Sequence, residues 1–174
     1  MKRLLSILVI CSLMTVTLGI GATTASAATP RNILVNYYSG KALTTSCDNI
    51  QQNNIILNDS QIWHIIKKGS TCGQEYFAIE NHGSGKVMEV ENSSTKRYAN
   101  IQQANYTGAD NQLWFIEYCE THDYTAYYHI KNKNSGQLLS ILSPYGGEGS
   151  NAEQYDADRN SDWQLWSIVS IEDR

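Results

Sequence analysis

Gln61-Ile62-Trp63, Gln112-Leu113-Trp114 and Gln164-Leu165-Trp166 repeat one tripeptide pattern, and this repetition decides the fold. The three tryptophans are 51 and 52 residues apart. A single glutamine-x-tryptophan carries no information. Three at a nearly constant period indicate that one structural unit is present in three copies. The sequence therefore predicts a repeat architecture.

Two further landmarks precede each tryptophan motif in the same order. The first is a turn that contains serine and glycine, and the second is a polar block that ends in glutamine. The turns are Ser39-Gly40-Lys41, Ser84-Gly85-Lys86 and Ser135-Gly136-Gln137, and the blocks are residues 49–52, 100–103 and 151–154. From the last glutamine of each block to the glutamine of the motif is 9, 9 and 10 residues. This shared order supports three copies of one unit.

The N-terminal residues have the pattern of a secretory signal peptide. Lys2-Arg3 gives a positive start, an apolar run extends from Leu4 to Ala22, and Ala25-Ser26-Ala27 is a small-x-small cleavage site. A membrane anchor is the alternative, but Ser and Thr interrupt the run and a cleavage motif follows it. We expect residues 1–27 to be removed. Residues 28–174 then form one secreted, extracellular domain with copies at about 32–70, 74–120 and 125–171.

The charge balance argues against nucleic acid and anionic membranes as partners. The formal net charge is −4, and loss of Lys2 and Arg3 lowers it to −6. Scattered basic residues in an acidic chain offer no electrostatic footprint for a phosphate backbone. No other apolar stretch approaches the roughly 20 residues of a membrane helix. The sequence predicts no nucleic-acid partner and no membrane insertion.

Cysteine and histidine patterns point to no metal, cofactor or enzyme. Cleavage leaves Cys47, Cys72 and Cys119, an odd number that allows at most one disulfide. If one forms, we expect Cys72 to pair with Cys119, because each follows a tryptophan motif near a junction between copies. The spacing fits no zinc pattern, and no nucleophile motif occurs. A catalytic pair of carboxylates like that of a glycosidase stays an open alternative, because sequence alone cannot show that two carboxylates lie close together.

The segments between the landmarks have the pattern of short β-strands. Residues 32–36, 76–80 and 127–131 are rich in aromatic and branched side chains, and turn clusters bound such runs. No window of about 11 residues or more has a helical stripe. Each copy is too small to bury its own apolar face, so three copies must share a core. A closed barrel of about twelve strands leaves few sheet edges exposed.

These residues resemble the ricin-type β-trefoil lectins. The resemblance rests on the three glutamine-x-tryptophan motifs with their upstream turns, and it covers residues 32–171. It implies an all-β fold: a β-trefoil of three four-stranded repeats with pseudo-threefold symmetry. We expect Trp63, Trp114 and Trp166 to lie in the core, because a repeated indole is most simply a core residue. The glutamine amide can bond a neighbouring turn and hold it in place.

The resemblance also implies one shallow sugar site per copy, built from an acid, an aromatic ring and an Asn-Gln pair. Such a site stacks a ring on sugar C–H groups while the acid and amide bond adjacent hydroxyls. In copy two, Glu89 takes the acid position, Asn111-Gln112 is the pair, and Gln102 lies in the polar block. Ala104 takes the aromatic position. Tyr106, two residues further on, lies on the same strand face as Ala104 if the strand continues.

The other two copies match this pattern less well. Copy one has Thr44 at the acid position. Copy three has Tyr155 as its aromatic residue, but Ser140 replaces the acid and Trp163 replaces the asparagine. The predicted sugar contacts are Glu89, Gln102, Asn111, Gln112, Tyr155 and Gln164.

We therefore hypothesise a secreted carbohydrate-binding protein that recognises polysaccharide or cell-surface glycans. Single shallow sites bind weakly, and several sites gain affinity on a polymer through avidity. The alternative is a protein-binding trefoil. It would be an accessory or receptor-targeting part of a secreted toxin, or a protease inhibitor, with loops that recognise the partner. A sugar site requires Glu89 and Asn111-Gln112 to converge on one shallow pocket with an aromatic wall, and divergence would favour the alternative.

Overall fold

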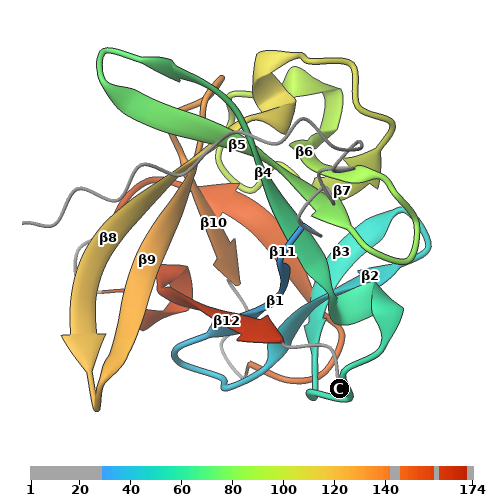
Figure 1. Ribbon diagram of the computed structural model, residues 1–174, viewed down its shortest axis with the longest axis vertical. Coiled ribbons are helices and arrows are strands. Elements are labelled where there is room, and N and C mark those ends of the chain that lie inside the picture. The colour runs from blue at the N-terminus through green and yellow to red at the C-terminus, as the bar shows by residue number, and fades with distance from the viewer. Residues whose placement is uncertain (1–28, 142–145, 159–160, 172–174) are drawn as a thin grey trace, which may run out of the picture.

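The computed structural model describes residues 29–141, 146–158 and 161–171, which form twelve strands and four short 3-10 helices (Figure 1). The predicted signal peptide lies outside them. The strands are β1 (Arg31–Asn36), β2 (Ala42–Ser46), β3 (Asn49–Asn53), β4 (Trp63–Thr71), β5 (Gln74–Asn81), β6 (Val87–Val90), β7 (Ile101–Ala104), β8 (Trp114–His122), β9 (Thr125–Asn132), β10 (Leu138–Ile141), β11 (Ser150–Tyr155) and β12 (Trp166–Ile171). The 3-10 helices are η1 (Asp59–Gln61), η2 (Glu91–Ser93), η3 (Asp110–Gln112) and η4 (Asp162–Gln164). The strands expected at 32–36, 76–80 and 127–131 lie in β1, β5 and β9, and the all-β prediction is confirmed.

Six of the strands close into a ring. β4 pairs with β5, β8 pairs with β9, and β12 pairs with β1 along the whole length of both strands. Each motif tryptophan is the first residue of a strand that also pairs with a strand of a neighbouring pair. The residues opposite Trp63, Trp114 and Trp166 are Asn32, Phe77 and Tyr128. Every strand of the ring therefore has two neighbours, which is how a barrel avoids open edges.

The other six strands form three hairpins that meet one another. The hairpins are β2–β3, β6–β7 and β10–β11, and β3 pairs with both β7 and β11. Asn49 donates from Nδ2 to Oδ1 of Asn151 at 2.9 Å, and Asn151 donates from Nδ2 to Oδ1 of Asn100 at 2.9 Å. The first residue of each polar block thus joins the three copies.

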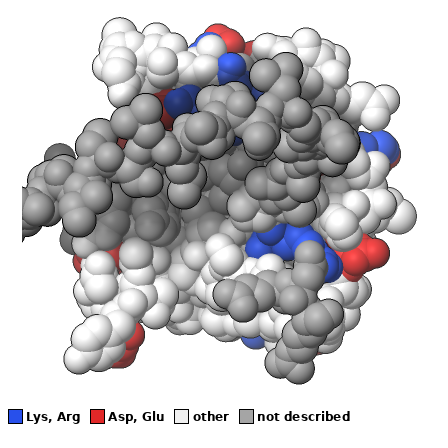
Figure 2. All heavy atoms as spheres, viewed as in Figure 1, with Lys and Arg blue, Asp and Glu red and all other residues white. Residues whose placement is uncertain are grey.

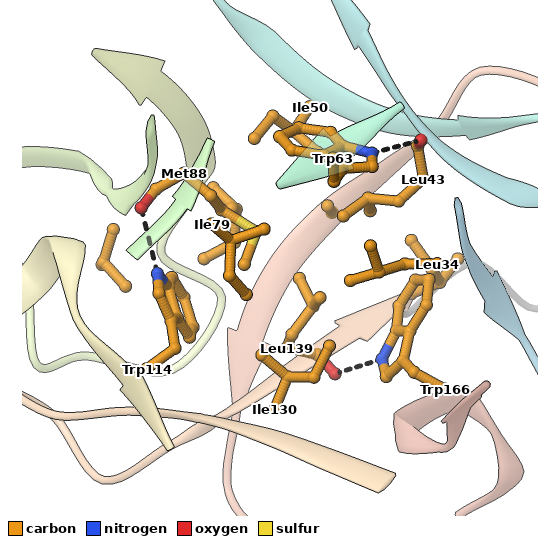
Figure 3. Packing of buried hydrophobic residues seen from close by; sticks show 14 residues of the cluster. Leu34, Leu43, Ile50, Trp63, Ile79, Met88, Trp114, Ile130, Leu139 and Trp166 are labelled. Carbon is orange, nitrogen blue, oxygen red and sulfur yellow. Dashed lines mark hydrogen bonds between the residues drawn. The ribbon is translucent and has the colours of Figure 1, made fainter. Parts of the chain in front are cut away.

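The three tryptophan side chains lie in one core (Figure 3). All three are fully buried, which confirms the prediction from their repetition. Each indole Nε1 donates to a backbone carbonyl at 3.0 Å, so the buried N–H group is satisfied. The acceptors are the carbonyls of Leu43, Met88 and Leu139. Aliphatic side chains from all three copies fill the space around the rings.

The landmarks of the sequence contact one another in each copy. Ser39, Ser84 and Ser135 each donate from Oγ to Oε1 of the glutamine that ends the polar block, at 2.6, 2.6 and 2.7 Å. The glycine that follows each serine has φ between 65° and 72°, a left-handed conformation that glycine adopts at no steric cost. The turn and the block that recur in each copy therefore contact each other.

The disulfide considered between Cys72 and Cys119 is not formed. Cys47, Cys72 and Cys119 are exposed and carry free thiols. Cys72 lies in the turn between β4 and β5, whereas Cys119 lies in β8 where the register with β9 shifts. Proximity in sequence to a junction between copies was therefore not sufficient to predict a disulfide.

Candidate functional site

The candidate site in copy two is a group of four polar side chains, the Glu89 cluster (Glu89, Gln102, Asn111 and Gln112). Met88 and Val90 of β6 are fully buried, so strand alternation turns Glu89, between them, away from the core. Gln102 lies opposite Glu89 on β7, and η3 supplies Asn111 and Gln112. Residues far apart in the copy therefore meet at one carboxylate.

The carboxylate of Glu89 accepts hydrogen bonds from three side-chain amides. Gln102 donates to Oε1 at 2.9 Å. Gln112 and Asn111 donate to Oε2 at 2.9 and 3.4 Å. Glu89 and Gln102 are half-buried, whereas Asn111 is 5% exposed and Gln112 is 1% exposed. Glu89, Asn111 and Gln112 therefore converge in this copy, while a shallow pocket with an aromatic wall stays a prediction.

Gln112 also holds the loop that follows β7. Its Nε2 donates to the carbonyl of Asn105 at 2.9 Å, and its Oε1 accepts from the backbone N–H of Thr107 at 2.7 Å. β7 ends at Ala104, so Tyr106 belongs to this loop, and the condition for its sharing a strand face is not met. Tyr106 is 42% exposed, and Nζ of Lys68 lies 4.3 Å from its ring centre. Contact of the buried Gln112 with sugar stays a prediction, and its observed bonds position the acid and the loop.

Copies one and three place a hydroxyl where copy two has the acid. Gln61 donates to Oγ1 of Thr44 at 3.1 Å, and Gln164 donates to Oγ of Ser140 at 2.9 Å. Both hydroxyls are buried, and each donates to a backbone carbonyl two residues earlier. In all three copies the glutamine of the tryptophan motif therefore donates to the side chain at the acid position. Among Thr44, Glu89 and Ser140, only Glu89 is a charged acceptor.

The aromatic residue predicted for copy three is in contact with a loop of copy two. The rings of Tyr155 and Tyr98 are 5.1 Å apart, and the guanidinium of Arg97 lies 5.4 Å from the Tyr155 ring centre. Arg97 also forms an ion pair with Asp156. A hydrogen bond with Tyr155 raises the pKa of Tyr98. Gln164 is fully buried, so sugar contact by Tyr155 and Gln164 stays a prediction.

Two aromatic contacts near these positions were not predicted from the sequence. Tyr98 has φ of 62° and is 60% exposed, at the position where copy three has Gly149 with φ of 76°. Trp163 is half-buried and its ring lies 3.6 Å from that of Tyr38. Alignment of the copies could have marked Tyr98 as unusual, but no pattern in the sequence predicts either ring contact.

The described residues contain neither a metal-binding group nor a membrane-spanning helix. No group of three or more His, Cys, Asp or Glu side chains in this part of the chain is arranged to hold a metal ion. No helix among the same residues has the length and apolar character to cross a bilayer.

The closed ring, the three hairpins and the shared tryptophan core define a β-trefoil. The chain belongs to the family described as ricin-type beta-trefoil lectin domain-like, whose model matches residues 30–103, 59–142 and 110–174. These overlapping matches cover the three copies in turn. No match was found among curated proteins.

Solved structures of β-trefoils are similar to this chain. The designed threefold-symmetric protein ThreeFoil is 31% identical with a TM-score of 0.70, over 81% of this chain and 99% of that one. The exo-beta-1,3-galactanase 1,3Gal43A from Clostridium thermocellum is 26% identical with a TM-score of 0.72, over 83% of this chain and 31% of that enzyme. The Polyporus squamosus lectin, solved with a sialylated trisaccharide, is 20% identical with a TM-score of 0.63, over 79% of this chain and 48% of that lectin, and shows the fold alone.

Proposed function

We propose that this protein is a secreted, non-enzymatic lectin that binds polysaccharide or cell-surface glycans through the Glu89 cluster. The single observation that carries the proposal is the convergence of three amides on the half-buried carboxylate of Glu89 in copy two. Acids and amides held at fixed angles are the groups that bind adjacent sugar hydroxyls. Membership of the lectin-like family supports the same reading.

The organisation of the chain is part of this proposal. Residues 28–174 form one domain of three four-stranded copies with pseudo-threefold symmetry, at about 32–70, 74–120 and 125–171. The matching indole and serine contacts of the three copies support it. Residues 1–27 are proposed to be a signal peptide. N-terminal sequencing of protein from the culture medium should then start at Ala28, and a start at Met1 would contradict secretion by cleavage.

The charged surface argues against a polyanionic partner. On the coloured part of the face in Figure 2, Lys and Arg form small separate groups beside Asp and Glu. We propose no nucleic-acid partner and no membrane insertion on this ground and on the acidic net charge.

Glycan-array screening followed by titration with the best ligand tests the function. Glu89→Ala should weaken binding about tenfold or more, because a charge-assisted hydrogen bond is worth roughly 1.5–3 kcal/mol. Glu80→Ala is the matched control: this half-buried glutamate lies in β5, outside the cluster, and its removal should leave affinity unchanged. Flat binding across the array would remove the lectin function. Equal loss in both variants would remove the assignment to Glu89.

A second candidate function is protein binding, as an accessory or receptor-targeting component of a toxin or as a protease inhibitor. The observation that favours it is an aliphatic loop in copy one, where Ile55, Ile56 and Leu57 are 43%, 67% and 55% exposed. Exposed aliphatic groups of this kind suit a protein contact better than a sugar hydroxyl. A flat glycan array, together with binding to a purified partner that is lost on Ile56→Ser, would establish this function.

A further inference from the structure

The hydrogen bonds of the Glu89 cluster determine which atoms are left for a ligand. A carboxylate only accepts hydrogen bonds, so Gln102, Asn111 and Gln112 must each turn their N–H groups towards Glu89. The side-chain oxygens of these amides then point away from the carboxylate. The acid therefore orients its amide neighbours as well as carrying charge.

Most N–H groups of the cluster are already used within the protein. Asn111 makes its second bond to the carbonyl of Val90 at 2.8 Å. Gln112 makes its second bond to the carbonyl of Asn105 at 2.9 Å. Of the amide donors, one N–H of Gln102 is left without a protein acceptor in the described residues.

The atoms without a protein partner are mainly acceptors. Oε1 of Gln102 and Oδ1 of Asn111 have no hydrogen-bond partner among the described residues, and Oε1 of Glu89 accepts one bond of the two it can take. Three oxygen atoms thus outnumber one N–H. A ligand that binds here must mainly donate hydrogen bonds.

The charge of the cluster, like its unpaired acceptor atoms, favours a ligand that donates hydrogen bonds. No basic side chain forms an ion pair with Glu89 in the part of the chain that the structure describes. The adjacent acid Asp110 is paired with Lys133, so that lysine is already engaged. Lys68 lies over the ring of Tyr106, on the loop held by Gln112, at 4.3 Å from the ring centre. The negative charge of Glu89 is stabilised by amide dipoles, and no described residue supplies a cation to it.

We infer that the Glu89 cluster selects saccharide units with a free amino group, such as 2-amino-2-deoxy sugars and polymers of them. This inference rests on the proposed function. A protonated amine supplies three N–H donors and a positive charge, which match three acceptor oxygens and a carboxylate. N-acetylation removes the charge and brings a carbonyl acceptor towards acceptor atoms, and acidic sugars meet a like charge.

The experiment compares matched sugars by titration calorimetry or NMR at a pH where the amine is protonated. The set is galactose, galactosamine and N-acetylgalactosamine, with the three glucose counterparts. In the galactose series, the glucose series or both, we expect the free amino sugar to bind about twofold to fivefold more tightly than the neutral and N-acetylated sugars. This is the gain in affinity expected from an exposed ion pair. Raising the salt concentration should reduce this preference and leave neutral sugars little affected.

Variants locate the preference within the protein. Glu89→Gln should abolish the difference between amine and N-acetyl sugars, whereas Glu80→Gln makes the same charge change outside the cluster and should preserve it. If Glu89→Gln disturbs the fold, the salt dependence in the unmodified protein still decides the matter. Amino sugars that bind no tighter than neutral ones, or a preference that survives salt or Glu89→Gln, would overturn the inference and leave the lectin function intact. Binding of none of these sugars would overturn the inference, and the glycan array separately decides the lectin function.

Discussion

At the scale of single residues, left-handed positions show how the copies have diverged. Four residues before the motif glutamine, copy two has Gly108 with φ of 81°, while copy one has Leu57 with φ of 54°. Leucine is strained there, because its Cβ approaches the following carbonyl at a cost of roughly 1–2 kcal/mol. Gln61 maintains this conformation by accepting hydrogen bonds from the N–H groups of Ile56 and Leu57.

Leu57→Gly should therefore leave stability unchanged or increase it. Relief of strain contributes about 1–2 kcal/mol, and the greater backbone freedom of glycine opposes it by about 0.5–1 kcal/mol. Urea unfolding measures the result, with Gly108→Leu as the reciprocal variant, which should lose about 1–2 kcal/mol. A loss of more than about 1 kcal/mol in Leu57→Gly would show that this side chain stabilises the fold.

At the scale of elements, the hairpin β8–β9 contains a cross-strand pair of ionisable groups. Glu117 on β8 lies opposite His129 on β9. Burial lowers the pKa of His129 from 6.5, although Glu117 and Glu120 oppose the shift. Burial alone would raise the pKa of Glu117, but hydrogen bonds from Gln74 and Lys131 and the charge of Lys131 bring it below 4.5. Both side chains therefore bind protons more weakly in the folded state than in the unfolded chain.

Stability should consequently fall as the pH is lowered. The unfolded state binds the extra proton in each case, so the loss at His129 starts below about pH 6.5 and the loss at Glu117 starts below about pH 4.5. Urea unfolding at a series of pH values measures both steps. His129→Gln should flatten the part between pH 7 and 5. A variant whose stability falls in parallel with the unmodified protein over that range would exclude His129 as the source.

At the scale of the whole molecule, side-chain hydrogen bonds join the three copies outside the apolar core. The bonds of Asn151 to Asn49 and Asn100 connect one hairpin from each copy. Pairing of β1 with β12 closes the ring through the two ends of the fold. Because each copy lacks a core of its own, we expect these contacts to act in one cooperative unfolding transition.

Asn151→Ala should destabilise the protein by about 1–3 kcal/mol, since it leaves an amide donor and an amide acceptor without partners. Asn105→Ala removes an exposed side chain that forms no side-chain bond in the described residues, and it should change stability by less than about 0.5 kcal/mol. Chemical unfolding of both variants provides the comparison. Equal small effects would mean that water replaces the asparagine contacts.

Patterns repeated along the chain were sufficient to predict much of the fold and part of the site. The tryptophan period predicted a shared core, and strand alternation placed Glu89 away from Met88 and Val90. The resemblance to the ricin-type lectins brought Glu89 and Asn111-Gln112 into one candidate site. The shared core and the direction of Glu89 depend on periodicity along the chain, which a single sequence displays directly.

Contacts between copies could not be read in this way. The ring contact between Tyr98 and Tyr155 joins residues of different copies, and β12 meets β1 from opposite ends of the fold. The sequence also did not show that β7 ends at Ala104, which places Tyr106 in a loop, or that Cys72 and Cys119 carry free thiols.

The sequence by itself determined the threefold repetition, the strand pattern and the residue types available at each candidate site. Only the tertiary structure decided which atoms of the Glu89 cluster are bonded and which are left for a ligand. The reason is physical: periodicity along the chain sets which face a side chain occupies, whereas hydrogen-bond direction depends on distances between segments that only the closed barrel brings together.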